Sequence, residues 1–527
     1  MGFSEPLTIV LHTDSQDHLQ QCLDHFGLEW TPDGKFIRWS SSNRRHPRNW
    51  RPLRKIFDTG MIIFLEFFTT AVSTAGSSAA SNAQSEFGIP STLSIFLFVS
   101  VYVYPLPLFD IVTHSPSYLL GQALGGIVFP PYSEAFGRKK LYVISTALYS
   151  VFCVLIAATP SLAGVVIGRF ATGFLSAIPT IVVAGSIEDM YNSKDRVWPV
   201  FLWCMFANMG LVVGPIMSTY IAADLNWKWV FYVAAIVNAI TAGLLLFIRE
   251  SRPSLLLGRE VAKLREATGI DSLRSLNPDH TPDMRTFARV ALFRPVRLFF
   301  GEPIVFTVST MSAFLVALGY LFTEALPPIY ESFGFEPRHA CLPFIAIGIG
   351  LVSSLFTRIL DRHIIAQRQR QGRPLLPEHK LTGFSIGAPV LAAALWCFAW
   401  TIPPRVVSVH WGASTVALIF IGYALNEFEA VLAGYLADSY LSYAASGFAA
   451  LSFLRSILSA TFPLFAPRMF GALGANVAVS VLASLATVFC IVPSLFTRYG
   501  ERIRARSKFA KYSLQVYAEN GVDRNGF

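Results

Sequence analysis

The sequence predicts an all-α polytopic membrane protein with twelve transmembrane helices in two six-helix bundles. Three observations predict this class. The 527 residues have a mean hydropathy of +0.50, and only 14% are charged, whereas about a quarter of the residues in soluble proteins are charged. Apolar runs long enough to cross a bilayer recur along the chain, and one polar, arginine-rich stretch divides them into two sets.

The apolar runs place each helix in order, because a helix needs about 20 apolar residues to span the hydrocarbon core. The first six helices are expected at 60–82, 92–131, 140–159, 162–187, 198–222 and 229–248. The second six are expected at 303–326, 340–360, 380–402, 413–436, 446–466 and 473–496. The predicted domains are a partly disordered tail (1–54), a first bundle (55–248), a linker (249–300), a second bundle (301–497) and a C-terminal tail (498–527).

The second helix is expected to contain an aberrant insertion at 102–117. The run from 92 to 130 is far longer than a bilayer span of about 20 to 25 residues, and it contains Pro105, Pro107, Asp110 and Pro116. Without 102–117 the run has the length of one helix. We therefore expect a retained intron in the gene, with an extracellular or re-entrant insertion as the alternative.

The intron hypothesis predicts that the mature transcript lacks the codons for 102–117. Their removal preserves the reading frame, and Val101 to Val103 can be encoded around a GTATGT donor, while Ser117 can supply the acceptor AG. Sequencing the transcript tests this prediction. A mature message that carries these codons throughout would contradict it.

The distribution of cations predicts the orientation in the membrane. Cations gather before the first helix, after the second, between the two sets and after the twelfth, for example at Arg44, Arg45, Arg138, Lys139, Arg249, Arg252, Arg498 and Arg502. The alternate loops hold few cations. Cytoplasmic loops are enriched in Lys and Arg, so both termini are expected in the cytoplasm. The net charge of +9 therefore does not indicate nucleic-acid binding.

A short internal sequence repeat indicates that the two bundles are related. The fourth helix ends in 184–191 and the tenth in 433–440, and both segments have the form Ala-Gly-x-x-x-Asp-x-Tyr. Asp189 and Asp438 therefore occupy corresponding ends of equivalent helices. Parallel repeats of this kind build pseudo-symmetric bundles in transporters.

The segment 119–140 is the most informative part of the chain. A glycine-rich apolar helix end leads into a turn with Glu134 and three adjacent cations, Arg138 to Lys140. Small residues allow close helix packing. A closely packed helix end followed by a charged turn at the membrane surface suits helices that move against each other. The segment resembles the loop between the second and third helices of major facilitator transporters, in their fungal, twelve-helix drug:proton antiporter branch.

Other segments extend the resemblance over most of the chain. Residues 168–173 resemble the helix-four motif whose buried arginine takes part in proton coupling, and 210–215 resemble the core of the antiporter signature in helix five. Two glycines of that signature are replaced here by Phe201 and Ser218, which puts close packing of helix five in doubt. Similar matches occur at 227–231, 302–303, 320–324, 443–456 and 462–465. The resemblance implies the major facilitator fold, with helix packing at Gly121, Gly125, Gly126, Gly210, Gly214 and Pro215.

Ionisable residues inside the membrane are costly and are functional candidates by default. The candidates for proton coupling or substrate binding are Arg169, Glu66, Glu324, Glu427, Glu429, Asn426 and Tyr320. Glu427 and Glu429 point about 200° apart on a helix, so only one can face a cavity fully. A structural ion pair is the alternative for Arg169 and Glu66, and a solvated rim position is the alternative for Glu324.

A second set of charges is expected to latch the two bundles in one state of the transport cycle. Salt bridges that form in only one state bias its population. The latch candidates are Glu134, Arg138, Lys139, Asp189, Asp438 and Arg455, with substrate contact as the alternative.

The sequence predicts a transporter and no enzyme, cofactor or metal site. The six cysteines are scattered, and the chain lacks a Walker lysine motif, paired catalytic carboxylates and Ser-His-Asp spacing. Aromatic residues make up 14% of the chain, and they suit either a cavity for flat or cationic compounds or lipid-facing positions.

We predict a proton-coupled exporter of small hydrophobic or amphipathic compounds, such as drugs or a fungal secondary metabolite. The alternatives are a polyamine exporter, an uptake transporter and a transport-inactive membrane sensor. The expected partners are the substrate, protons and the lipid bilayer, and the protein is expected to be a monomer. It is expected to be a multi-pass protein of the plasma membrane, with the vacuolar membrane as the alternative.

Overall fold

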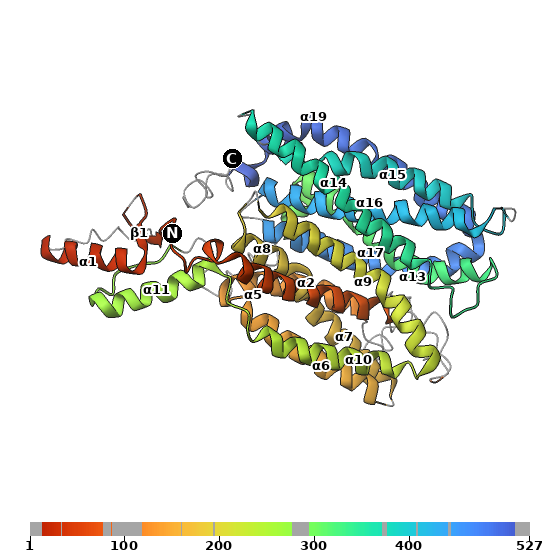
Figure 1. The fold of residues 1–527 in the computed structure, drawn as a ribbon, viewed down its shortest axis with the longest axis horizontal. Helices are drawn as coiled ribbons and strands as arrows, with labels where there is room; N and C mark the ends of the chain where they lie inside the picture. The colour runs from red at the N-terminus through yellow and green to blue at the C-terminus, as the bar shows by residue number, and fades with distance from the viewer. Residues whose placement is uncertain are drawn as a thin grey trace.

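The structure is a computed structural model, and it describes residues 13–32, 34–76, 86, 118–159, 161–192, 195–276, 295–371, 377–406, 409–440 and 444–511. Long helices run side by side in an elongated bundle, and a small module projects from one end of it (Figure 1). The segment 102–117, where we predict an aberrant insertion, lies outside the described residues.

The helices of the first half follow the predicted runs. They are α2 (Pro52–Thr74), α5 (Tyr118–Phe136), α6 (Lys139–Ala158), α7 (Leu162–Ala177), α8 (Val183–Met190), α9 (Val197–Asp224) and α10 (Lys228–Leu245). A π-helical turn, η2 (Ile178–Val182), connects α7 to α8, so these two segments form one membrane-crossing rod. Pro179 in this turn has no backbone N–H to donate, which favours the irregular hydrogen-bonding pattern there.

The helices of the second half are α13 (Pro303–Glu331), α14 (Phe344–Arg370), α15 (Thr382–Ala399), α16 (Trp411–Tyr440), α17 (Ala444–Leu473), α18 (Ala475–Phe489) and α19 (Ile491–Arg506). Among the described residues, eleven helical spans are long and apolar enough to cross a membrane, and α5 adds the shorter apolar helix Tyr118–Pro130. The predicted class, an all-α polytopic membrane protein, is therefore confirmed.

Several helices extend beyond their predicted bounds. α2 begins at Pro52 rather than at 60, because its charged first turns find partners outside the hydrocarbon region. Arg54 pairs with Asp58 at 3.1 Å, and Lys55 donates to the Arg48 carbonyl at 2.7 Å. Hydropathy predicts the part of a helix that contacts lipid. It does not predict where the hydrogen-bonded helix begins and ends.

Glycines bring helices of the first half into backbone contact. A Cβ atom at Gly121 of α5 would lie 2.7 Å from the Phe174 nitrogen of α7, and one at Gly210 of α9 would lie 2.6 Å from the Phe67 carbonyl oxygen of α2. Gly125 and Gly214 repeat these two contacts one turn further along. The helix α9 passes through Pro215 without a break, and it packs closely on α2 despite Phe201 and Ser218.

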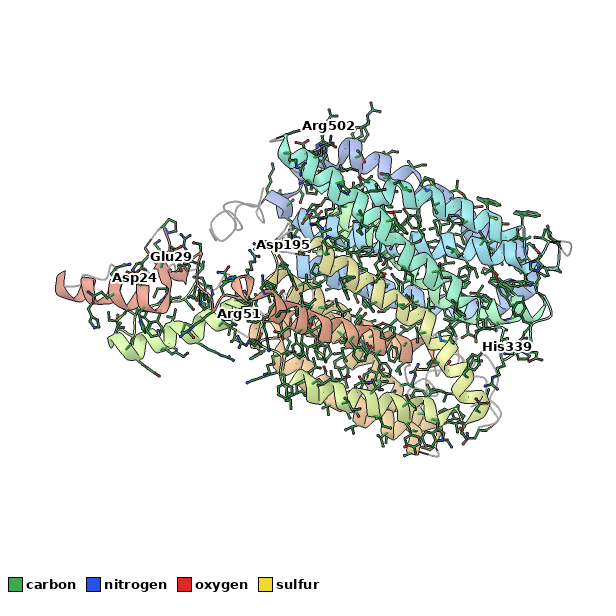
Figure 2. The ribbon with its side chains drawn as sticks, in the orientation of Figure 1. Asp24, Glu29, Arg51, Asp195, His339 and Arg502 are labelled. Carbon is green, nitrogen blue, oxygen red and sulfur yellow. The ribbon has the colours of Figure 1, made fainter. Side chains whose placement is uncertain are left out.

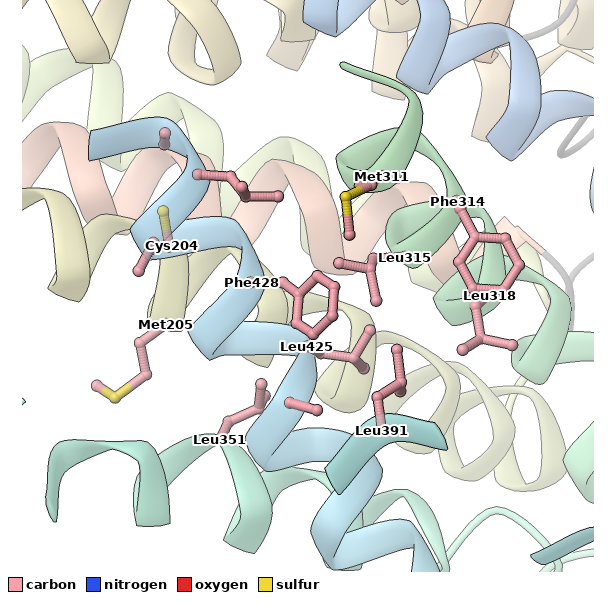
Figure 3. Packing of buried hydrophobic residues seen from close by; sticks show 14 of the residues in the cluster. Cys204, Met205, Met311, Phe314, Leu315, Leu318, Leu351, Leu391, Leu425 and Phe428 are labelled. Atoms are coloured by element: carbon pink, nitrogen blue, oxygen red, sulfur yellow. The ribbon is translucent and has the colours of Figure 1, made fainter. Parts of the chain in front are cut away.

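The second half repeats this packing. A Cβ atom at Gly350 of α14 would lie 2.7 Å from the Tyr423 nitrogen of α16, and one at Gly422 would lie 2.8 Å from the Ile347 carbonyl carbon. Gly126 of α5 instead approaches Ile181 of η2 and Ser452 of α17, where the two halves meet. A continuous hydrophobic core also crosses between the halves, from Cys204 and Met205 of α9 to Met311 and Phe428 (Figure 3).

The tail module combines the N-terminal tail with the linker. It contains α1 (Thr13–Phe26), the antiparallel strands β1 (Leu28–Trp30) and β2 (Ile37–Trp39), and α11 (Pro253–Thr268) from the linker. Its core consists of Leu19, Leu23, Leu28, Ile37, Trp39, Leu257, Val261, Leu264 and Leu273. The described part of the predicted tail is folded, because α11, more than 200 residues away in sequence, covers the apolar faces of α1 and the strands.

The tail module defines one end of the bundle, which we call the tail end. Charged side chains gather at the ends: Arg51, Asp195 and Arg502 lie at the tail end, and His339 lies at the opposite end (Figure 2). The 3-10 helix η1 (Pro47–Asn49) joins the module to α2 and contacts α8.

His46, just before η1, makes the tail module sensitive to pH. Burial first, and then the nearby Arg48 and Lys55 cations, lower the pKa of His46 to about 3. The unfolded chain has a pKa near 6.5 at this position, so below that pH it takes up a proton that the folded module does not. We expect the free energy of unfolding to fall by about 1 kcal/mol per pH unit as the pH drops from 6 to 4. Thermal unfolding of the wild type and of His46→Asn measures this, and equal pH slopes in the two proteins would contradict it.

Candidate functional site

A polar cavity lies between the two halves. Its empty space is about 390 Å³ with the adjoining open solvent included, and both halves line it. Its lining residues are Glu66, Thr70, Gln122, Thr180, Ala207, Asn208 and Leu211 from the first half, and Val316, Tyr320, Ser452, Arg455, Ser456 and Ser459 from the second. Most of these side chains can form hydrogen bonds. A compound in this cavity would therefore meet polar groups from both halves.

A second cavity of about 360 Å³ adjoins the first and shares Thr180, Ser452 and Arg455 with it. Trp203 and Phe448 line this second cavity, so it offers the aromatic surface that the polar cavity provides only through Tyr320. Many other aromatic side chains point outward, including Phe64, Phe247, Phe300, Phe356 and Phe420. The outward rings on membrane-spanning helices, such as Phe64, Phe356 and Phe420, support the lipid-facing alternative that the sequence left open.

An ion pair on the second half faces the first half across the cavities. Arg455 Nη1 of α17 lies 2.5 Å from Glu429 Oε1 of α16. The other oxygen, Glu429 Oε2, accepts a hydrogen bond from Asn208 Nδ2 of α9 at 2.8 Å. Both carboxylate oxygens are therefore used, one within the second half and one between the halves.

Glu427 and Asn426 turn away from both cavities. Glu427 is fully buried, and its Oε2 pairs with Arg358 Nη2 of α14 at 2.8 Å. The same guanidinium pairs with Asp361 at 2.8 Å. Asn426 donates to Ser354 Oγ at 2.7 Å. The two-residue spacing thus separates Glu429, which faces the interface between the halves, from Glu427, which faces the interior of the second half.

Glu66 faces the polar cavity from the middle of α2. Its Oε2 accepts a hydrogen bond from Thr180 Oγ1 at 3.1 Å, and Gln122 Nε2 donates to the same hydroxyl at 3.2 Å. The π-helical turn η2 therefore places Thr180 against the acid. Among the described residues, Glu66 makes no ion pair within 4 Å, but the Arg455 guanidinium lies close enough to act on its charge.

Tyr320 and Glu324 lie one turn apart on α13 but have different surroundings. The Tyr320 hydroxyl lines the polar cavity and shares a 2.7 Å hydrogen bond with Ser73 Oγ of α2. Glu324 lies outside the lining of both cavities, and its Oε1 is buried with no hydrogen-bond partner in the described structure.

Arg169 is fully buried behind the cavity, inside the first half. Its guanidinium donates to the Val72 and Ser73 carbonyl oxygens at 3.5 and 3.3 Å, in the last turn of α2. It also lies over the rings of Tyr118 and Phe231, at 4.8 and 5.5 Å. A cation at the carbonyl end of a helix offsets its partial negative charge, so Arg169 holds the end of α2 in place.

The latch candidates of the first half gather at the tail end. Arg138 Nε pairs with Asp189 Oδ2 at 2.7 Å, and Arg252 lies 3.8 Å from the same carboxylate. The backbone nitrogens of Arg138 and Lys139 donate to the Glu250 carboxylate at 2.9 and 3.1 Å. Glu134 lies one turn earlier, in the last turn of α5.

One tail-end ion pair joins the two halves. Arg196, just before α9, lies 2.6 Å from Asp438 at the end of α16, and Lys380 lies 2.5 Å from the same carboxylate. The sequence reasoning missed Arg196, Lys380 and Glu250. The internal repeat could have indicated Lys380. Asp438 corresponds to Asp189, and Lys380, just before the ninth helix, corresponds to Arg138, which precedes the third helix and pairs with Asp189.

Arg455 does not lie with the other latch candidates. It belongs to the cavities, paired with Glu429, because it lies well inside α17 rather than at a helix end. At the opposite end of the bundle, Arg338 pairs with Asp224 at 2.9 Å and lies over the Tyr220 ring. Ion pairs therefore join the two halves at both ends of the bundle.

Comparisons with known proteins agree with this architecture. The family model of the Major Facilitator Superfamily matches residues 63–463. The chain is 32% identical to the multidrug transporter TPO1_2 of Candida glabrata over 475 residues, which cover 89% of this chain and 78% of the relative. It is 30% identical to the efflux pump radE of Floropilus chiversii, with coverage of 90% and 86%, and 30% identical to the MFS-type transporter penM of Penicillium rubens, with coverage of 91% and 92%. The solved proton:xylose symporter XylE shares the fold with a TM-score of 0.58 at 14% identity, covering 86% of this chain and 96% of that one.

Proposed function

The chain belongs to the Major Facilitator Superfamily, and we propose that it is a proton-coupled efflux transporter of small hydrophobic or amphipathic compounds. The family is one of transporters rather than enzymes, and its members are multi-pass membrane proteins that move small molecules. Relatives are named multidrug transporters and efflux pumps, which supports export of drugs or of a secondary metabolite.

One observation supports the proton coupling: the acid Glu66 faces the cavity between the halves, and it makes no ion pair within 4 Å in the part of the chain that the structure describes. Glu66 accepts a hydroxyl hydrogen bond, whereas the neighbouring Glu429 is paired with Arg455. An ionisable group at this depth is costly to keep charged, so it binds a proton or a cationic group readily. An acid that holds either a proton or a substrate couples their opposite movements.

The polar lining favours polyamines as the second candidate substrate class. Glu66 and the surrounding hydroxyl and amide groups suit an ammonium group, while Trp203 and Phe448 suit an apolar part of an amphipathic compound. Uptake and a transport-inactive sensor remain the less favoured alternatives, because relatives named efflux pumps match over most of the chain.

We also propose the domain division and the membrane topology. The bundles comprise 55–248 and 301–497, the linker comprises 249–300, and the tail end faces the cytoplasm, since most loop cations lie there. The protein acts as a monomer in the plasma membrane. The ion pairs of Arg138 with Asp189 and of Arg196 with Asp438 act as latches that favour closure of the tail end.

Glu66→Gln tests the proposal, because glutamine keeps the hydrogen-bonding shape but does not titrate. In energised vesicles we expect efflux of cationic compounds to fall by about tenfold or more, and efflux of neutral compounds to fall less. Glu331→Gln, at the exposed end of α13, is the matched control and is expected to behave as wild type. Equal losses for both classes would assign Glu66 to proton transfer alone, and unchanged efflux would contradict its role in transport.

A further inference from the structure

The segment 507–511, which we call the C-terminal clamp, connects the start of α13 to the end of α16. Glu302, just before α13, is buried, and its two carboxylate oxygens have different partners. Oε1 accepts a hydrogen bond from Ser507 Oγ at 2.9 Å, and Oε2 accepts one from Tyr440 Oη at 2.9 Å. Tyr440 is the last residue of α16. One carboxylate therefore holds together three segments that are far apart in sequence.

Ser507 separates two helical stretches. α19 ends at Arg506, Ser507 has an extended backbone with φ −70° and ψ 126°, and a helical turn follows over 508–511. The Ser507 hydroxyl oxygen accepts a hydrogen bond from the Ala510 nitrogen at 2.9 Å, so it caps the start of this turn. A hydroxyl has one proton to donate, and Ser507 donates it to the carboxylate of Glu302.

Few buried groups hold the C-terminal clamp in place. Ser507 and Ala510 are buried and Phe509 is partly buried, whereas Lys508 and Lys511 are exposed. Serine and alanine bury little apolar surface, so the clamp belongs to the low end of local stability. It can therefore leave its site while the rest of the bundle stays folded. Opening of this kind presents the Ser507 hydroxyl to solvent and to an enzyme.

Three arginines precede Ser507 at alternate positions, Arg502, Arg504 and Arg506. Arg502 and Arg506 are exposed, and Arg502 lies on the outside of the bundle at the tail end (Figure 2). Alternate residues of an extended chain point to the same side, so the three guanidinium groups form one row of positive charge once this stretch opens. Such a row directly before a serine matches the acidic substrate-binding cleft of a basophilic protein kinase.

The same C-terminal stretch holds the end of α16 through a second carboxylate. Glu378, before α15, accepts hydrogen bonds from Arg504 Nε at 2.9 Å and from Arg504 Nη2 at 2.6 Å. It also accepts one from Tyr435 Oη at 3.2 Å. Tyr435 and Tyr440 lie on either side of Asp438, which makes the tail-end ion pair between the halves. The docked C-terminal stretch therefore supports the part of α16 that carries this ion pair.

We propose that Ser507 is a phosphorylation site, and that its phosphorylation releases the C-terminal clamp from Glu302. The enzyme is a basophilic protein kinase that uses ATP. Ser507 Oγ forms a bond to the γ-phosphorus of ATP, the bond from that phosphorus to the bridging oxygen breaks, and ADP leaves. The hydroxyl proton passes to the catalytic carboxylate of the kinase. The site goes beyond the proposed function, and it relies on that proposal only for the cytoplasmic side of the tail end.

Phosphorylation turns an attractive contact into a repulsive one. The hydroxyl donates to a carboxylate, whereas phosphoserine carries about −1.5 to −2 charges at pH 7. At the buried position beside Glu302, the two negative groups repel each other and the phosphate loses its water, so the docked state is disfavoured. In the released segment the phosphate lies in water, near the exposed Arg506 and Lys508. Release leaves Glu302 with Tyr440 as its one described side-chain partner, so the end of α16 is held less firmly.

Phosphorylation of the purified full-length protein tests the site. The protein in detergent is incubated with ATP, Mg²⁺ and the catalytic subunit of a cyclic-AMP-dependent protein kinase, and mass spectrometry maps the modified residues. We expect phosphate on Ser507, at a rate about tenfold lower in the double variant Arg502→Gln/Arg506→Gln, whose two positions are exposed. Both ends of the protein are accessible in detergent, so the result does not depend on the membrane topology. No phosphate at position 507, or an unchanged rate in the double variant, would overturn the site.

Hydrogen exchange of the backbone amides measures the release. We expect the amides of 507–511 to exchange about tenfold faster in the phosphorylated protein and in Ser507→Asp than in the wild type. Ala505→Asp is the matched control, because it adds a negative charge at an exposed position of the same stretch and leaves the contact with Glu302 intact. In Glu302→Gln the repulsion is absent, so phosphorylation is expected to accelerate the exchange less.

The outcomes separate the clamp from the proposed function. Exchange of 507–511 that stays the same after phosphorylation, or that rises equally in Ala505→Asp, would overturn the release. If Ser507→Asp does not fold, the wild-type protein before and after phosphorylation still decides the proposal. A protein that releases its clamp on phosphorylation but exports none of the tested compounds would contradict the proposed function and leave the phosphorylation site supported.

Discussion

Arg169→Ala is expected to abolish gradient-driven efflux while the protein still reaches the membrane. The guanidinium holds the carbonyl end of α2 at Val72 and Ser73, and α2 carries Glu66 and one partner of the Ser73–Tyr320 bond. Without this cation the carbonyl end of α2 loses a hydrogen-bond donor, so Glu66 and the Ser73–Tyr320 hydrogen bond lose their fixed positions. We expect efflux to fall by at least about tenfold.

Transport assays in vesicles, matched for the amount of protein in the membrane, measure this effect. Arg169→Lys is the informative companion variant, because lysine keeps the charge but cannot donate to two carbonyl groups in a fixed fork. Partial recovery in that variant would assign the effect to both charge and geometry. Normal efflux in Arg169→Ala would remove the residue from the mechanism.

Gly173→Ala is expected to have the largest effect on folding. A Cβ atom at Gly173 of α7 would lie 2.6 Å from the Tyr118 Cα atom and closer still to its carbonyl group, so two backbones would have to separate. Overpacking of this kind costs roughly 3 kcal/mol or more where backbone has to move. We expect a lower thermal unfolding midpoint and loss of monodisperse protein.

Gly434→Ala is the matched control on α16. A Cβ atom there has open space around it, so alanine should stabilise the helix by up to about 1 kcal/mol. A thermal unfolding midpoint for Gly173→Ala at or above that of wild type would contradict the close approach of α5 and α7.

Hydropathy predicted the helices well, because the bilayer imposes a minimum apolar length that a single sequence displays directly. It predicted their ends less well, since Pro52 to Asp58 are helical outside the apolar run. The tail module could not be predicted, because Leu23 and Ile37 are covered by Leu257 and Leu264, and such long-range contacts leave no local pattern.

The candidate site was predicted in part. Helical geometry required Glu427 and Glu429 to point apart, but the choice between them depends on how α16 is rotated in the bundle, which periodicity alone does not fix. Asn208 was missed, although a polar side chain in the middle of an apolar helix is a usable signal. Arg196 was missed because its partner Asp438 lies in the other half of the chain.

Proton movement in response to substrate tests the central claim most directly. Purified protein in liposomes that hold a pH-sensitive dye is exposed to a candidate compound across an imposed pH gradient. The account predicts that the compound moves against the protons, that both fluxes depend on the gradient, and that Glu66→Gln abolishes the coupled proton movement. Substrate flux that proceeds equally with and without the gradient, and moves no protons, would contradict it.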